Sequence, residues 1–232
     1  MMTGLVRKAT LLSVCGLLGA SAAIAGVPSA TNSIIGTGIQ LVGTAGGVAD
    51  VKGQKLITVK DAIGNTVQNS TVTINFTACT TAGAELRLCS TQPQAGVGVS
   101  CGNHEVVALT DASGIATFRV VGNALNPGGG SPGLPAAGFG TAGAVVKADG
   151  VTLGTLNVGA YDQNGAGGVG SVDLALVAND RFSVNNVTAN TGNFRGRSDF
   201  NGDGFVNSVD LALEAQVRFG PGSIASCASA CP

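Results

Sequence analysis

Oxygen-bearing side chains stand at every second position of one short stretch of this chain, which is the spacing that a cation-binding loop requires. The stretch is "DFNGDGFVNSVD", residues 199–210. A tightly wound loop aims alternate side chains at its centre, where calcium takes about six to eight oxygen ligands. The sequence therefore predicts a calcium site whose ligands are Asp199, Asn201, Asp203, Phe205 through its backbone carbonyl, Asn207 and Asp210.

The other positions of this stretch, which we call the second loop, also suit calcium. Gly204 is sixth, where the sharp turn favours glycine, and Val206 is eighth, where an apolar residue packs paired loops together. Asp210 replaces the glutamate that closes an ordinary EF-hand loop, so it has to reach the ion from a different backbone placement. An Asx-rich turn without metal is the alternative, and the full twelve-residue pattern favours the calcium loop.

An earlier stretch, "DQNGAGGVGSVD" at residues 162–173, is a reduced copy that we call the first loop. Its matching ligand positions are Asp162, Asn164, Gly168 through its carbonyl, and Asp173. Ala166 replaces the fifth-position carboxylate, and Gly170 replaces the ninth ligand. Because affinity depends on the charge and number of ligands, we expect this loop to bind calcium poorly or to be a structural remnant.

Each loop leads into a nearly identical segment. "SVDLALVANDRF", residues 171–182, lies 37 residues before "SVDLALEAQVRF", residues 208–219, and nine of the twelve residues agree. Alternating apolar residues imitate a strand here, but Leu, Ala, Glu, Gln and Arg form helices well, so we predict a helix in both segments. Residues 153–161 read as a strand and residues 188–198 are rich in Asn, Gly and Ser. Each repeat is therefore a loop followed by one helix, without an entering helix.

Such a tandem pair resembles the dockerin family, type I, and the residues that carry the likeness are "DQNGAGGVGSVDLAL" and "DFNGDGFVNSVDLAL". The resemblance implies that residues 159–220 attach the protein to a cohesin-like receptor on a scaffold or cell surface. In that family the tenth and eleventh loop residues often touch the partner; here they are Ser171, Val172, Ser208 and Val209. The family usually has a hydroxyl pair there, so the two valines depart from its pattern.

The segment before the repeats, residues 26–158, reads as short strands separated by turns. "KLITV", "VTINFTA", "EVVAL", "IATFRVV" and "AVVKA" carry β-branched residues, and Asp149-Gly150 accepts the positive φ of a tight hairpin before "VTLGTLNV". We expect an antiparallel β-sandwich, so that the whole chain is mainly β with a small helical pair at its end. Residues 126–140 are rich in glycine and proline and read as a mobile surface loop.

Three stretches of this segment resemble the bacterial Ig-like domains of the invasin/intimin type, the Big-1 group: "VKDAIGNTVQNSTVTINF", "TDASGIATFRV" and "AVVKADGVTLGTLNV". Such domains act as spacers or adhesive modules on cell surfaces, so the likeness implies no catalysis. Asp61, Asp111 and Asp149 stand in turn signals, where capping of the backbone is the expected role of the carboxylate.

The N-terminus has the layout of a secretory signal peptide. Arg7 and Lys8 precede an apolar run, and the small residues around Ala25 predict cleavage after it. A membrane anchor is the alternative, but the run is short and is diluted by Ala, Gly and Ser. We therefore expect residues 1–25 to be removed and the protein to be secreted or held at the cell surface, with no membrane span in the mature chain.

Export favours disulfides, and the mature chain keeps five cysteines: Cys79, Cys89, Cys101, Cys227 and Cys231. An odd number leaves at least one thiol outside any intramolecular disulfide. Residues 221–232 form a cysteine-containing tail in which the two cysteines are near enough to close a small loop, and one pair is expected among the other three. Zinc is disfavoured because the single histidine stands alone.

Composition narrows the function further. The formal net charge is -1, so there is no basic field for nucleic acid and no polybasic patch for a membrane. Glycoside hydrolysis needs two carboxylates about 5–10 Å apart, and the predicted sandwich has few aromatic residues to stack sugars. We predict a non-catalytic, secreted, calcium-binding protein that docks to a cohesin-like partner. The alternatives are a calcium-stabilised structural or adhesin protein of the cell surface without that receptor, and an accessory component in polysaccharide degradation.

Overall fold

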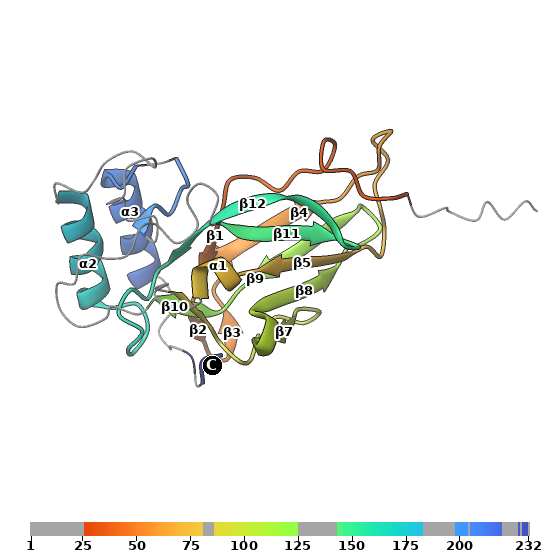
Figure 1. Ribbon diagram of the computed structural model, residues 1–232. Coiled ribbons are helices and arrows are strands. Elements are labelled where there is room, and N and C mark those ends of the chain that lie inside the picture. Colours follow the sequence, from red (N-terminus) through yellow and green to blue (C-terminus); the bar gives the residue numbers. More distant parts are fainter. Residues whose placement is uncertain are drawn as a thin grey trace, which may run out of the picture.

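The computed structural model describes residues 26–80, 86–124, 143–182, 198–203, 205–219, 227 and 229–231. The predicted signal peptide, the predicted loop at 126–140, most of residues 188–198, Gly204 and most of the tail lie outside the described residues. Within them the protein is mainly β: a curled six-stranded sheet and three two-stranded sheets form one unit, which two packed helices follow. Figure 1 shows the helices side by side at one end of the β unit.

The six-stranded sheet has the order β1–β12–β11–β5–β8–β7. Its strands are β1 (Gly38–Leu41), β5 (Thr71–Asn75), β7 (Gly98–Ser100), β8 (Glu105–Leu109), β11 (Ala144–Ala148) and β12 (Val151–Ala160). β1 runs parallel to β12, with Ile39 opposite Val158, whereas the other neighbours are antiparallel. The sheet is therefore mixed, and the expectation of a wholly antiparallel arrangement is wrong at this edge. The long chain between β1 and β12 makes a parallel crossover possible.

Shorter elements complete the β unit. β4 (Gln54–Thr58) pairs with β9 (Ile115–Arg119), β6 (Leu86–Leu88) with β10 (Gly122–Ala124), and β2 (Thr44–Ala45) with β3 (Val48–Ala49). A one-turn helix and two 3-10 turns lie between strands: α1 (Thr77–Thr80), η1 (Val51–Gly53) and η2 (Cys101–Asn103). The predicted strands are confirmed as β4, β5, β8, β9, β11 and β12, except that the end of "VTINFTA" turns into α1.

The main apolar core joins the six-stranded sheet to the β4–β9 pair. Val72 and Ile74 of β5 are fully buried, and the residues between and beside them are more exposed. Ile57 of β4 and Phe118 of β9 belong to the same buried cluster and are also fully buried. Side chains alternate between the two faces of a strand, so the β-branched alternation in the sequence marks the inward face of each strand.

The turn aspartates behave as predicted. Asp149 and Gly150 have φ values of 47° and 84°, which a tight primed turn between β11 and β12 requires. Asp61 Oδ1 and Asp111 Oδ1 each accept two backbone N–H bonds, from the residues two and four positions ahead. Asp149 Oδ1 accepts from Thr71 N at 2.8 Å, which ties this turn to the start of β5. These three carboxylates therefore hold turns in place.

Two helices follow the loops, α2 over Ser171–Phe182 and α3 over Ser208–Arg218. The helix prediction is confirmed for both repeats. The strand-like alternation is misleading, because the buried positions of α3 recur with helical spacing at Asp210, Glu214 and Val217. Within the residues that the structure describes, no helix is long and apolar enough to cross a membrane.

The two helices share a second apolar core with the β unit. Val42 belongs to the same buried cluster as Tyr161, Phe200 and Val217. Tyr161 directly precedes the first loop, Phe200 is near the start of the second loop, and Val217 belongs to α3. The rings of Tyr161 and Phe200 lie 4.5 Å apart between centroids. Gln40 Nε2, from β1, donates to Phe200 O at 2.7 Å. The loop–helix repeats are therefore packed onto the β unit through apolar and hydrogen-bonded contacts.

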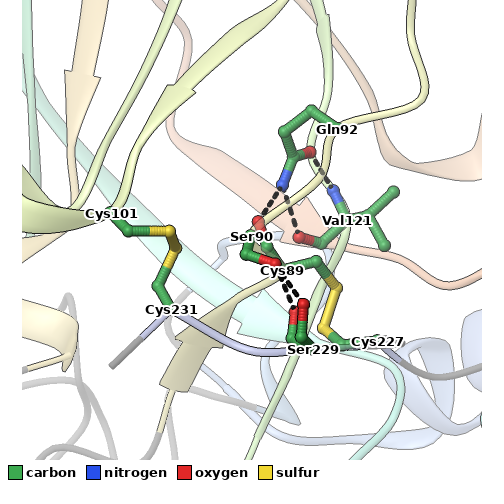
Figure 2. The surroundings of a disulfide bond; sticks show 8 residues. All are labelled: Cys89, Ser90, Gln92, Cys101, Val121, Cys227, Ser229 and Cys231. Carbon is green, nitrogen blue, oxygen red and sulfur yellow. Dashed lines mark hydrogen bonds between the residues drawn. A yellow bond between two sulfur atoms is a disulfide. The ribbon is translucent and has the colours of Figure 1, made fainter.

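Two disulfides fasten the tail to the β unit, Cys89–Cys227 and Cys101–Cys231 (Figure 2). The expected small loop between the two tail cysteines is wrong, and so is the expected pair among the three cysteines of the β unit. The reason is that the tail returns to the β unit, where each of its cysteines meets a different partner. Cys79 is outside both disulfides, and burial raises the pKa of its thiol to about 12.

The returning tail also makes strand-like contacts. Ser90 N donates to Ser229 O at 2.9 Å, and the hydroxyl groups of the same two serines are hydrogen-bonded to each other (Figure 2). Gln92 holds the backbone at Val121, since its Nε2 donates to Val121 O at 2.9 Å and its Oε1 accepts from Val121 N at 2.7 Å. The second repeat is thus held at its far end by disulfides and by backbone hydrogen bonds.

Candidate metal-binding loops

In the second loop the carboxylate of Asp210 gathers the backbone around itself. Its Oδ1 accepts from Phe200 N at 2.8 Å, and its Oδ2 accepts from Asn207 N at 2.8 Å. Asp199 Oδ1 accepts from Gly202 N at 2.8 Å. Both aspartates are 0% exposed. The first and twelfth residues of the loop therefore close the turn from opposite ends.

The first loop has the same hydrogen bonds at the same positions. Asp173 Oδ1 accepts from Gln163 N at 2.7 Å, and Asp173 Oδ2 accepts from Gly170 N at 2.7 Å. Asp162 Oδ1 accepts from Gly165 N at 2.7 Å. The loop therefore keeps the wrapped backbone of the second loop, although Ala166 and Gly170 stand at its fifth and ninth positions. We call this shared set of bonds the loop frame.

The helices repeat each other in exposure as well as in sequence. From Ser171 to Asp180 and from Ser208 to Val217, each pair of equivalent residues falls in the same class of exposed, half-buried or buried. The apolar residues at the eighth loop position are also both buried, with Val169 7% exposed and Val206 0% exposed. The two repeats are therefore near-equivalent halves of one unit.

The predicted ligands of the second loop differ in burial. Asp203 is exposed; its Oδ1 accepts from Phe205 N at 2.9 Å, and its Oδ2 accepts from Asn201 Nδ2 at 2.8 Å. Asn207 caps α3, because its side-chain oxygen accepts from Val209 N at 2.7 Å. Among the described residues, no three His, Cys, Asp or Glu side chains gather where one metal ion could hold them. Calcium in this loop would therefore depend on amide and carbonyl oxygens as well as on carboxylates.

The first loop contains a buried carboxylate oxygen that fits a cation. Asp162 is 1% exposed, and its Oδ2 has no hydrogen-bond partner. Burial, and then the charge of Asp173, raises the pKa of Asp162 to about 6. A buried acceptor without a donor is unfavourable, and a divalent cation would neutralise both carboxylates. Asp162 and Asp173 are thus the residues that would hold calcium here.

The second loop also contains a buried carboxyl group with a raised pKa. Burial raises the pKa of Asp210, and the charge of Asp203 raises it further, against the lowering effect of its backbone hydrogen bonds. A cation placed between these carboxylates would reverse the effect of both burial and repulsion. In both loops, a bound cation would therefore offset the unfavourable burial of these carboxylates.

One residue of the unit escaped the sequence predictions. Glu214 of α3 is 0% exposed, and neither of its carboxylate oxygens has a hydrogen-bond partner. Burial and then the charge of Asp173 raise the pKa of Glu214 to about 7, while Arg218 lowers it. Alignment of the two repeats could have identified Glu214, because its equivalent in the first repeat is the apolar residue Val177, which is also fully buried.

The residues predicted to touch a partner lie at the starts of the two helices and are all exposed: Ser171, Val172, Ser208 and Val209. Val172 is 55% exposed and Val209 is 50% exposed. Each repeat therefore presents the same serine and valine to solvent beside its loop.

A cavity of about 410 Å³ lies where the β unit meets the second loop. Its walls include Lys52 and Lys55 from the β unit, Phe200 and Asn201 from the loop, and Leu213 of α3, with no acidic side chain among the lining residues. Burial lowers the pKa of Lys55. None of the buried aspartates of the loops lines this cavity, although its wall includes Asn201, one of the predicted ligands.

Comparison with protein-family models, curated proteins and solved structures finds no match for this chain.

Proposed function

We propose that residues 159–220 are a calcium-dependent docking module, similar to a type I dockerin, that holds this secreted protein to a cohesin-like partner. The observation that carries the proposal is the equivalence of the two repeats, which share a loop frame, a burial pattern and an exposed Ser-Val pair. Calcium would fix each loop against the start of its helix, and so fix the exposed pair. Two similar faces give a partner two surfaces to which it can dock.

The β unit would then be an Ig-like spacer or adhesive domain of the Big-1 type. Immunoglobulin-type sandwiches join strands C, F and G in one sheet, with C′ added at its side in some, and pair B with E in the other sheet. The same scheme results when the strands are matched in chain order to B, C, C′, E, F and G: these are β4, β5, β8, β9, β11 and β12. Then G–F–C–C′ is the sheet order β12–β11–β5–β8, and B pairs with E as β4 pairs with β9. This succession supports the Ig-like proposal. The two disulfides support export, because such bonds form in oxidising compartments.

Calcium titration of the mature chain, followed by calorimetry, tests the metal part of the proposal. The parent should show a tighter transition from the second loop and a weaker one from the first. Asp203→Ala should remove the tighter transition, and Ala166→Asp should strengthen the weaker one, because each change alters the number of carboxylates in one loop. Asp111→Asn, in a turn of the β unit, is the control. If Asp203→Ala titrates like the parent, the calcium assignment of residues 199–210 is wrong.

Binding to an immobilised type I cohesin domain, with and without calcium, tests the docking part. Val172→Asp and Val209→Asp each place a charge in one face, so either single variant should still bind through the other face. The double variant should not bind, and neither should the parent in chelator. The docking proposal fails if no cohesin-type domain binds the calcium-loaded parent, or if the double variant binds as the parent does.

The second candidate is a calcium-stabilised part of a cell-surface structural protein without a dedicated receptor. The shared core around Tyr161 and Phe200 favours it, because the repeats are packed onto the β unit. The disulfides of the tail favour it for the same reason. Under this candidate, calcium raises the thermal midpoint of the parent, whereas no cohesin domain binds.

A further inference from the structure

Glu214 is an unusual residue for the middle of a helix interface. It is fully buried, and neither carboxylate oxygen is hydrogen-bonded. A buried carboxylate without a partner is strongly unfavourable, whereas an apolar side chain at such a position is favourable. The first repeat follows that rule, since its equivalent residue is the fully buried Val177. Glu214 therefore destabilises the metal-free fold, whereas the valine at the equivalent position of the first repeat does not.

The surroundings of Glu214 belong to the opposite repeat. Helices α2 and α3 pack against each other, and Asp173, the last residue of the first loop, is close enough for its charge to act on Glu214. Glu214 also acts on Tyr161, the residue directly before Asp162, as do Asp50 and Asp210. The unpaired carboxylate of the second repeat therefore lies within electrostatic reach of the last residue of the first loop.

The two loops differ in their number of carboxylates, and Glu214 compensates for this difference. The second loop has three aspartates, whereas the first has only Asp162 and Asp173, because Ala166 stands at the fifth position. The first loop also has an unpartnered carboxylate oxygen, Asp162 Oδ2. Counted with Glu214, whose carboxyl is coupled electrostatically to Asp173, the first loop has three carboxylates, as the second loop has.

We propose that Glu214 of α3 completes the calcium site of the first loop, as the third carboxylate of an ion held by Asp162 and Asp173. This inference rests on the calcium binding proposed above. The described carboxylates do not gather at one point, so Glu214 acts through a water molecule on the ion rather than as a direct ligand. The first site would then include residues of both repeats, and calcium bound there would hold α3 against the first loop.

Glu214→Val tests this proposal, because it copies the residue that the first repeat has at this position. We use the mature chain with Asp203→Ala as background, so that the tighter transition of the second loop is removed, and calcium chloride as the probe. Loss of an outer partner typically weakens metal binding about 10–100-fold, and Glu214→Val should weaken the remaining transition by that factor. Glu214→Gln keeps the size of the side chain and should weaken it as well.

A second measurement needs no calcium. Metal-stripped Glu214→Val should unfold at a higher temperature than its background, because an unpaired buried carboxylate is replaced by an apolar side chain. Glu105→Gln, which removes a carboxylate from β8 of the β unit, is the matched control and should leave the calcium transition unchanged.

The outcomes separate the two proposals. If the Asp203→Ala background still shows a weak calcium transition that Glu214→Val and Glu214→Gln leave unchanged, the role of Glu214 is overturned while calcium binding stands. If the parent shows no calcium transition at all, both proposals fail. A weaker transition together with a more stable metal-free fold supports the site across the two repeats.

Discussion

The first and second repeats wrap their backbones around an aspartate in the same way, but they surround that aspartate with different charges. Asp173 and Asp210 each accept N–H bonds from the second and ninth residues of their loops. Asp162 and Asp199 each accept one from the fourth residue. This loop frame survives in the first repeat although its fifth and ninth residues are Ala166 and Gly170. The backbone of the loop therefore depends on its first and last aspartates and not on the side chains at the fifth and ninth positions.

The differences between the repeats concern charge. The fifth position is Ala166 in one loop and Asp203 in the other, and the ninth is Gly170 against Asn207. Both positions lie outside the set of side chains that form the loop frame, so they can change without loss of the fold. The shape of the loop and the charges that it carries are therefore separable properties of the sequence.

The repeats also differ in their attachment to the β unit. The first repeat continues directly from β12, which ends at Ala160. The second repeat is followed by the tail, whose cysteines Cys227 and Cys231 are bonded to the β unit. Beyond the core that both repeats share with the β unit, one repeat is therefore attached by chain continuity and the other by disulfides.

Removal of the disulfides should have the largest effect on stability, because it removes the attachment that is specific to the second repeat. Cys227→Ser with Cys231→Ser opens loops of 138 and 130 residues, and the chain-entropy view gives about 4–5 kcal/mol for a single loop of that size. We expect the thermal midpoint to fall by on the order of 10 °C. Hydrogen exchange should show a greater loss of protection in α3 than in α2. Equal loss in both helices would contradict the difference in attachment, and Ser229→Ala, which keeps both disulfides, is the control.

Loss of the twelfth aspartate should have the next largest effect. Asp210→Ala leaves the N–H groups of Phe200 and Asn207 without their acceptor, and each buried unsatisfied donor costs about 1–3 kcal/mol. Asp173→Ala should destabilise the metal-free protein to a similar degree, because the loop frame is the same. Asp203→Ala, at an exposed position outside the frame, should change the stability in chelator by less than about 0.5 kcal/mol. Chemical denaturation in chelator measures all three, and a loss from Asp203→Ala as large as that from Asp210→Ala would show that the frame is not confined to the end aspartates.

Much of the architecture could be predicted because local signals were strong. The Asp149-Gly150 turn has few alternative conformations, and the β-branched strands beside it have a clear inward face. The helices were predictable from residue propensity and from the loops that precede them, although the apolar alternation suggested strands. These features depend on neighbours in the sequence.

Features that depend on distant contacts could not be predicted. The β1–β12 pair and the Cys89–Cys227 and Cys101–Cys231 bonds join segments more than 100 residues apart, and no local pattern determines such partners. Glu214 is different, because comparison with Val177 marks it as a charge at an apolar position. What the sequence did not reveal is its neighbour, Asp173, which lies on the other helix.

The pH dependence of the metal-free protein sharpens the contrast between Glu214 and Val177. The carboxyl of Glu214 has an ordinary pKa of 4.5, which burial and Asp173 raise to about 7 in the fold, with Tyr161 nearby and Arg218 acting in the opposite direction. The folded state therefore binds the proton more tightly. The stability that this group contributes is fully present below pH 4.5 and is lost as the pH rises through 7.

We expect the thermal midpoint of the metal-stripped protein to rise by on the order of a few degrees between pH 8 and pH 5. Asp162, whose pKa is raised to about 6, contributes in the same direction. Glu214→Val should therefore reduce the rise without abolishing it, as followed by circular dichroism. An unchanged pH dependence in this variant would mean that Glu214 is not the group that titrates.

The smallest effect should come from restoring the ninth residue of the first loop. Gly170→Asn gives α2 the side-chain cap that Asn207 gives α3, and at a helix start asparagine is better than glycine by a few tenths of a kcal/mol. The site has room, because a Cβ on Gly170 would lie 3.6 Å from Asp173 Oδ2, an ordinary contact, and Gly170 is not among the described glycines with positive φ. The variant should also bind calcium more tightly in the first loop, since it regains a ninth ligand. Titration in the Asp203→Ala background measures this directly, with Gly170→Ala as the control that adds the Cβ without the amide. If Asn and Ala behave alike, the ninth position has no part in ion binding, and the weakness of the first loop follows from Ala166 alone.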